Sequence, residues 1–201
     1  MDFPENRGTY SESERVTMTT YRIGYLVGSL SANSINRKLA LALKALAPAN
    51  LELVEIEIKD LPLYNHDLDG AYPAEATALK DAIAAADALL YVTPEYNRSI
   101  PGALKNAIDW ASRPWGQNSL GKPSAVVGAS IGAVGTAVAQ QHLKGILNFS
   151  DATLFNQPEV YLQFTEGLIT ESGEVTNEGT AAFLKAWLEG YAAFVAAHVS
   201  K

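Results

Sequence analysis

The segment ALLYVTPEYNRSIPGALKNAIDWA, residues 88–111, decides the fold class. It opens with an apolar run that ends at Thr93, which is typical of a strand buried on both faces. Pro94 and Pro101 then stiffen a polar loop, and Pro101 suits the first position of a helix. The pattern of residues 102–111 predicts that helix. A buried strand, a loop and a helix in this order indicate a parallel βαβ unit.

The rest of the chain repeats this unit. Apolar or alternating runs predict strands at 22–27, 51–56 and 124–130, with a shorter strand at 153–155. Amphipathic patterns predict helices at 36–46, 75–85, 135–147 and 178–198. Because parallel strands are joined by right-handed helical crossovers, we expect a mostly parallel sheet with helices on both faces.

Composition narrows the possible functions. The 201 residues are 48 % apolar, which is enough for one large core. The net charge of −7, without a long basic run, argues against a nucleic-acid partner. The absence of cysteine excludes disulfides and thiolate catalysis, and the three widely spaced histidines suggest no metal site. With neither a membrane-length apolar stretch nor a secretory-signal pattern, we expect a cytoplasmic protein.

The chain divides into a tail and one domain. Residues 1–20 are polar and charged, with little to bury, and are predicted to form a disordered N-terminal tail. The apolar patterning starts at Tyr21, so the folded domain is expected to span residues 21–201.

Three predicted strand-to-helix loops are rich in small and polar residues. In open parallel sheets, ligands bind at the carboxyl ends of the strands. Residues 28–37, GSLSANSINR, combine hydroxyl and amide side chains with a helix start, which favours an anion site over simple capping. Residues 93–102 form a stiff loop with an aromatic side chain that suits a planar ring, and the glycines of residues 130–135 permit close approach of a ligand. These loops predict a phosphate-bearing cofactor.

Four stretches carry a family resemblance: GSLSANSINRKLA, LPLYNHDLD, TPEYNRSIPGALKNAIDWASRP and SIGAVGTAVAQQHLKGIL. They resemble the NAD(P)H-dependent FMN reductases, in particular the bacterial chromate/quinone reductases, azoreductases and ferric reductases. The resemblance implies a flavodoxin-like fold, a doubly wound parallel five-stranded sheet in the order 2-1-3-4-5. It also implies bound FMN, NADPH or NADH as co-substrate, and a homodimer or homotetramer.

The same resemblance implies a set of cofactor-binding residues. The FMN phosphate is expected at Ser29, Ser31, Ser34, Ile35 and Asn36, and the ring at Pro94, Glu95, Tyr96, Asn97, Ser130 and Gly132. Glu95 is assigned a structural or ring-edge role, not proton transfer. Many relatives carry Arg where this chain has Ser31, so FMN should be held more weakly, or its charge should be neutralised by Arg37.

Candidates for the subunit contact are Tyr64, Trp110, Arg113 and Trp115, although both tryptophans suit a core equally well.

The predicted activity is a ping-pong, two-electron reduction of quinones or similar acceptors: azo dyes, chromate, ferric chelates or flavins. The flavin carries the chemistry, so no catalytic side chain is required. One alternative is a flavodoxin-type electron carrier without nicotinamide turnover, although a net charge of −7 is modest for such carriers. A nucleotide-binding regulator without flavin is a third possibility.

Overall fold

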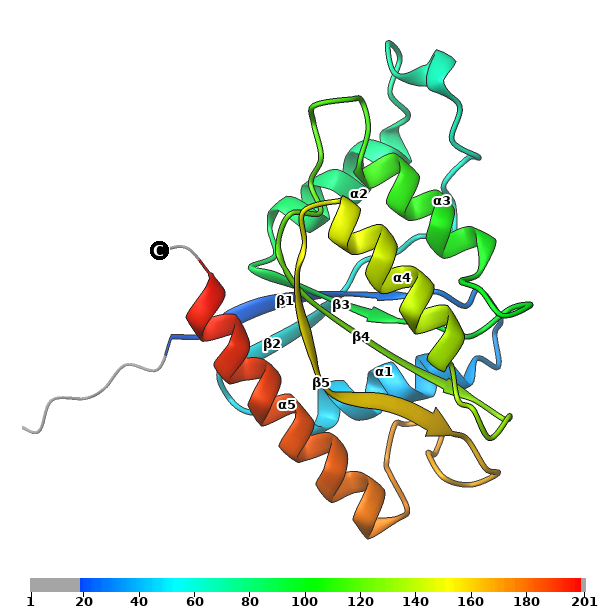
Figure 1. Ribbon diagram of the computed structural model, residues 1–201, viewed down its shortest axis with the longest axis vertical. Helices are drawn as coiled ribbons and strands as arrows, with labels where there is room; N and C mark the ends of the chain where they lie inside the picture. The colour runs from blue at the N-terminus through cyan, green and yellow to red at the C-terminus, as the bar shows by residue number, and fades with distance from the viewer. Residues whose placement is uncertain (1–18, 200–201) are drawn as a thin grey trace, which may run out of the picture.

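A computed structural model of the chain describes residues 19–199. Five strands form one parallel sheet in the order β2-β1-β3-β4-β5, as predicted (Figure 1). The strands are β1 (Tyr21–Val27), β2 (Leu51–Glu55), β3 (Ala88–Val92), β4 (Pro123–Ser130) and β5 (Thr153–Gln163). Apart from residues 19 and 20, the predicted disordered tail lies outside the described residues.

Helices cover both faces of the sheet. One layer contains α1 (Ile35–Leu46) and α5 (Glu178–His198), and the other contains α2 (Ala74–Ala84), α3 (Gly102–Ala111) and α4 (Ala137–Phe149) (Figure 1). A short 3₁₀ helix, η1 (His66–Leu68), lies in the loop before α2. Within residues 19–199, no helix is long and apolar enough to cross a membrane.

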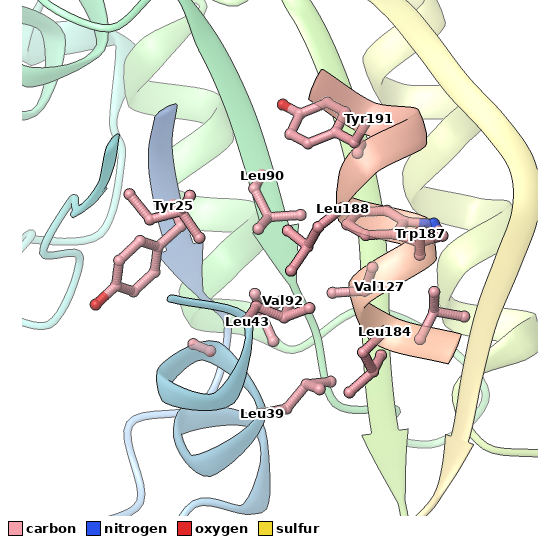
Figure 2. Close-up of a cluster of buried hydrophobic side chains, with 14 of the residues drawn as sticks. Tyr25, Leu39, Leu43, Leu90, Val92, Val127, Leu184, Trp187, Leu188 and Tyr191 are labelled. Carbon is pink, nitrogen blue, oxygen red and sulfur yellow. The ribbon is translucent and has the colours of Figure 1, made fainter. Parts of the chain in front are cut away.

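The position of β3 in the middle of the sheet explains why its sequence is apolar throughout. Side chains alternate across a strand, so Leu90 and Val92 face the core under α1 and α5, while Leu89 and Tyr91 face the core under α2, α3 and α4. Figure 2 shows the first of these cores, in which Leu39 of α1 and Leu188 of α5 converge on the sheet. Both faces of β3 are therefore buried, and it occupies the middle of the sheet.

Strand β5 is longer than the predicted segment 153–155. It continues to Gln163, and its pairing with β4 is irregular: Ala125 pairs with Phe155, but Val127 pairs with Val160. The extra residues on β5 include Pro158, which lacks the N–H that a regular ladder needs. Because β5 is an edge strand, it tolerates this interruption, which hid the second half of the strand from its pattern.

Trp110 belongs to the core. Its side chain is 0 % exposed, its Nε1 donates to the Pro62 carbonyl at 2.7 Å, and Tyr64 and Tyr72 pack against it edge-on. The expectation that Trp110 contributes to a contact surface is therefore wrong. Trp115 differs, because 79 % of it is exposed.

Candidate functional site

Three loops meet at the carboxyl edge of the sheet. They follow β1, β3 and β4, which are neighbours in the sheet, so loops far apart in the sequence lie side by side. Together they surround a shallow hollow of about 250 Å³. Its lining consists of Ser29, Ser31, Asn33, Ser34, Ile35, Asn36, Pro94, Glu95, Tyr96, Ala129, Ser130 and Ile131.

The hollow brings together most of the residues predicted to bind the cofactor. Asn97 and Gly132 are the predicted residues that do not line it. Asn33, Ala129 and Ile131 line it without having been predicted. Ile131 is largely exposed. The sequence signal that could have identified it was an apolar residue within a glycine-rich loop.

The loop after β1 contains both a helix cap and unused donors. Ser34 is the N-cap of α1, and its Oγ accepts from the Arg37 N–H at 3.2 Å. Simple capping thus accounts for this one serine. Among the described residues, the N–H groups of Ile35 and Asn36 in the first turn donate to no protein acceptor. Together with the hydroxyls of Ser29 and Ser31, they form a set of neutral donors at the positive end of a helix dipole.

The side chain of Asn36 is committed elsewhere. It is 1 % exposed, its Nδ2 donates to the Ala129 carbonyl, and its Oδ1 accepts from the Ala129 N–H, both at 2.9 Å. The predicted role of Asn36 in phosphate binding therefore depends on its backbone N–H. Its side chain ties the start of α1 to the end of β4. An asparagine in the first turn of an apolar helix face was the sequence signal for such a tie.

Among the lining residues there is no lysine or arginine. Arg37, the expected alternative cation, pairs with Glu55 at 2.5 Å and lies outside the lining. The Tyr25 hydroxyl donates to the same carboxylate, and burial together with Glu55 raises the pKa of Tyr25 to about 12. The charge of Arg37 is therefore already balanced by the protein.

The loop after β3 contains a tight two-residue turn. Tyr96 and Ser99 exchange two backbone hydrogen bonds of 2.9 and 3.0 Å, and Asn97 and Arg98 between them have φ of 50° and 62°. Two positive φ values mark a type I′ turn, which asparagine adopts readily and arginine rarely. The turn leaves the Tyr96 ring half exposed beside the hollow, and Asn97 occupies the turn itself.

Glu95 is held by three donors. Its Oε2 accepts from the N–H groups of Val138 and Ala139, both at 3.1 Å, and its Oε1 accepts from Arg98 at 2.9 Å. These contacts support a structural role for the carboxylate. No local pattern indicates these contacts, because Glu95 and α4 are more than 40 residues apart.

The loop after β4 lies against β5. A Cβ on Gly135 would approach the Tyr161 backbone to 2.8 Å, and Gly135 has φ +60°, so a side chain there is excluded on both counts. The glycine accounts for the start of α4 at Ala137, two residues later than predicted. The Ser130 Oγ accepts from the Gly132 N–H at 3.2 Å, which shapes the turn beside the hollow.

The donor set of the hollow fits FMN. Hydroxyls and first-turn N–H groups suit a phosphate, and Pro94, Tyr96 and Ile131 offer apolar surface for a planar ring. A larger hollow of about 580 Å³ lies between α3 and α4, lined by Lys105, Asp109, Arg113, His142 and Phe149 among others. Apart from Ser99 in the loop after β3, it is lined by α3, by α4 and by the residues that follow these two helices, whereas ligands of open parallel sheets bind at the strand ends.

The chain is similar to known flavin-dependent reductases. Residues 21–167 match the family model described as NADPH-dependent FMN reductase. The chain is 50 % identical over 175 residues to a 2-hydroxy-1,4-benzoquinone reductase from a Burkholderia species, covering 87 % of this chain and 96 % of that protein. It also resembles the solved structure of FerB, a flavoenzyme NAD(P)H:(acceptor) oxidoreductase from Paracoccus denitrificans. The TM-score is 0.85 at 44 % identity, covering 89 % of this chain and 99 % of that one.

A mutant of a flavodoxin from Pseudomonas aeruginosa shares the fold alone. Its TM-score is 0.53 at 20 % identity, and the match covers 87 % of this chain and 99 % of that one. The architecture is therefore flavodoxin-like, as the resemblance implied.

Proposed function

The chain belongs to the NADPH-dependent FMN reductase family, and we propose that it reduces quinones by two electrons at the expense of NAD(P)H. As a member of this family it is an oxidoreductase that uses FMN and NAD(P)H. The relative named as a 2-hydroxy-1,4-benzoquinone reductase supports a quinone as the acceptor. Azo dyes, chromate, ferric chelates and free flavins are the competing acceptors.

The observation that carries the proposal is the hollow in which the three loops meet. We assign its serine-rich end to the FMN phosphate and its Pro94–Tyr96 end to the ring. The phosphate ligands would be the hydroxyls of Ser29, Ser31 and Ser34 and the N–H groups of Ile35 and Asn36. The ring would contact Pro94, Tyr96 and the backbone of Glu95, with Ser130 at its other edge. Asn97 and Gly132, which lie outside the lining, would border it. When bound, FMN supplies the two-electron hydride chemistry, and the protein supplies position and electrostatics.

The open form of the hollow supports a mechanism in which NAD(P)H and the acceptor bind one after the other from the same side. The hollow is shallow, and its lining residues Tyr96 and Ile131 are 50 % and 78 % exposed, so it is open to solvent. NAD(P)H and the acceptor would enter from this open side in turn, which predicts ping-pong kinetics. The Glu95 carboxylate is already held by three donors, so we assign it no proton transfer.

Steady-state oxidation of NADH and of NADPH with a benzoquinone tests the activity. We expect parallel double-reciprocal plots when both substrates are varied, and a higher kcat/KM for the quinone than for a ferric chelate. FMN-loaded protein without nicotinamide turnover would favour an electron carrier instead. Protein that leaves FMN fluorescence unchanged in a titration would contradict any flavin site.

A paired variant tests the position of the phosphate end. Ser29→Ala with Ser31→Ala removes two hydroxyl donors, and we expect FMN affinity to fall by about tenfold or more. Ser172→Ala removes an exposed hydroxyl from a loop outside the lining and should leave the affinity unchanged. Equal affinities for both variants would place the phosphate elsewhere.

We also propose that the chain forms a homodimer or homotetramer through the surface beside α3 and α4. Trp115 and Phe149 are 79 % and 77 % exposed, and both line a hollow of about 250 Å³ next to the larger one between these helices. Contiguous exposed apolar side chains of this size mark association surfaces. Arg113 lies 5.8 Å from the Trp115 ring and belongs to the same surface.

A further inference from the structure

Helix α4 is capped by a residue from another loop. Its own N-cap residue, Thr136, makes no capping hydrogen bond. The Thr136 hydroxyl instead accepts from Gln140 Nε2 at 2.8 Å. The Glu95 carboxylate takes its place by accepting from the N–H groups of Val138 and Ala139. These groups are among the four first-turn donors that a helix leaves without a partner. A carboxylate also interacts favourably with the positive end of the helix dipole.

This contact joins two walls of the candidate site. Glu95 directly follows Pro94 in the loop after β3, and α4 directly follows the loop that begins after Ser130 and contains Ile131. The Glu95 side chain is only 7 % exposed, so solvent competes little for its hydrogen bonds. Arg98 pairs with the second carboxylate oxygen, which fixes the carboxylate from the side of its own loop.

We propose that Glu95 is a positioning residue that holds the two loops at the separation required to bind FMN. The proposal rests on the function proposed above for the hollow. The charge of the carboxylate is balanced by Arg98 and by the start of α4, so its contribution is reach and hydrogen-bonding geometry. Preorganising a site in its bound form raises affinity because ligand binding no longer has to order it.

The competing interpretation is a structural cap that stabilises the fold and nothing else. Asn177 offers the matched comparison, because its Oδ1 accepts from the Thr180 N–H at 2.8 Å and caps α5, which does not line the hollow. If Glu95 were only a cap, its loss and the loss of the Asn177 cap should affect melting temperature alone. A positioning role predicts an additional loss of FMN affinity for Glu95 variants.

Two conservative variants separate reach from charge. Glu95→Gln keeps the length of the side chain and a carbonyl oxygen that can accept from α4, whereas Glu95→Asp keeps the charge and shortens the side chain. Apoprotein of each variant, with wild type and Asn177→Ala, would be titrated with FMN by fluorescence quenching and melted without FMN. We expect Glu95→Asp to bind FMN about tenfold more weakly, the equivalent of one strong hydrogen bond. Glu95→Gln should stay within about threefold of wild type, and Asn177→Ala should bind as wild type does.

Three outcomes would overturn the proposal. Glu95→Asp binding FMN as tightly as wild type would show that the reach of residue 95 does not matter. Glu95→Gln binding as weakly as Glu95→Asp, or more weakly, would show that charge governs the site. Asn177→Ala losing FMN affinity to the same extent as Glu95→Asp would reduce the effect to general stability. Failure of the wild-type protein to bind FMN would instead contradict the proposed function.

Discussion

At the scale of single residues, Ser31 is the position where a substitution should strengthen the site. Ser31 is exposed at the rim of a hollow whose lining contains no lysine or arginine, and Arg37 is occupied by Glu55. An arginine at position 31 could offer a planar fork of donors to a phosphate. We therefore expect Ser31→Arg to tighten FMN binding by about tenfold, measured by fluorescence quenching of FMN on the apoprotein.

The control for this variant adds the same charge at the other edge of the sheet. Ala84 is exposed at the carboxyl end of α2, close to the start of β3 and therefore opposite the strand ends that carry the hollow. Ala84→Arg should leave FMN affinity unchanged. Unchanged or weaker binding by Ser31→Arg would mean that the phosphate is neutralised elsewhere.

Two buried tyrosines should respond oppositely to the same substitution. The Tyr91 hydroxyl has no hydrogen-bond partner among the described residues, whereas the Tyr191 hydroxyl donates to the Leu89 carbonyl at 2.8 Å. A buried polar group without a partner destabilises the fold, and a satisfied one stabilises it modestly. Urea unfolding should show Tyr91→Phe to be about 1 kcal/mol more stable than wild type and Tyr191→Phe about 1 kcal/mol less stable. Destabilisation of similar size in both variants would contradict this difference.

At the scale of elements, most of the fold could be predicted because strands and helices have local periodicity. The patterns placed β3, α3 and α5 almost to the residue, and the family resemblance supplied the strand order. What was missed depends on contacts distant in sequence. Pro158 interrupts the pattern of β5, and nothing local distinguishes a core tryptophan at 110 from a surface one at 115.

The residues of the candidate site likewise divide into those that a local pattern predicts and those whose contacts are distant in sequence. Loop composition identified the three loops that form the hollow, because small and polar side chains at strand ends are a local signal. The family resemblance supplied most of the individual lining residues, and Asn33, Ala129 and Ile131 were missed. The partners of the Asn36 and Glu95 side chains, Ala129 and the start of α4, were not predictable, because each contact joins segments more than 40 residues apart. A polar side chain that supports a loop and one that binds a ligand look alike in the sequence.

The contact between α4 and β5 should depend on pH. Lys144 donates to Glu159 at 2.7 Å, and this bond, followed by one from Tyr161, holds the pKa of Glu159 below its usual value. Since the folded-state pKa is lowered, the contribution to stability is present above the unfolded-state pKa of about 4.3 and is lost as pH falls through the folded-state value.

We expect Glu159→Gln to lower the free energy of unfolding by less than about 1 kcal/mol at pH 7, because the pair is partly exposed. The difference from wild type should shrink as pH falls below about 4.3 and should disappear once the pH is below the lowered folded-state pKa of Glu159. Glu171→Gln breaks the ion pair between Glu171 and Lys38, in which the Glu171 carboxylate is largely exposed. This variant should leave the free energy of unfolding unchanged at both pH values. A Glu159→Gln effect that persists at low pH would mean that packing is responsible, not charge.

At the scale of the whole molecule, the helix layers on the two faces of the sheet differ in which large apolar side chains they leave exposed. The outer surface beside α3 and α4 leaves Trp115 and Phe149 exposed next to two hollows. On the other face, α5 buries Trp187 and Tyr191 and leaves Phe183 partly exposed. The candidate site lies at the carboxyl edge between these layers. A partner copy seated on the α3–α4 surface would thus cover apolar side chains without blocking the edge that NAD(P)H has to reach.

Trp115→Ser tests this contact surface. Tryptophan is among the side chains whose loss weakens interfaces most, by about 2 kcal/mol or more at a central position, which is roughly a thirtyfold rise in the dissociation constant. We expect sedimentation velocity to show an oligomer for the wild type and a shift toward monomer for Trp115→Ser. Phe183→Ser, which removes an exposed aromatic ring from α5 on the opposite face, should leave the oligomer intact. A wild type that sediments as a monomer, or an oligomer broken only by Phe183→Ser, would place the contact elsewhere or remove it altogether.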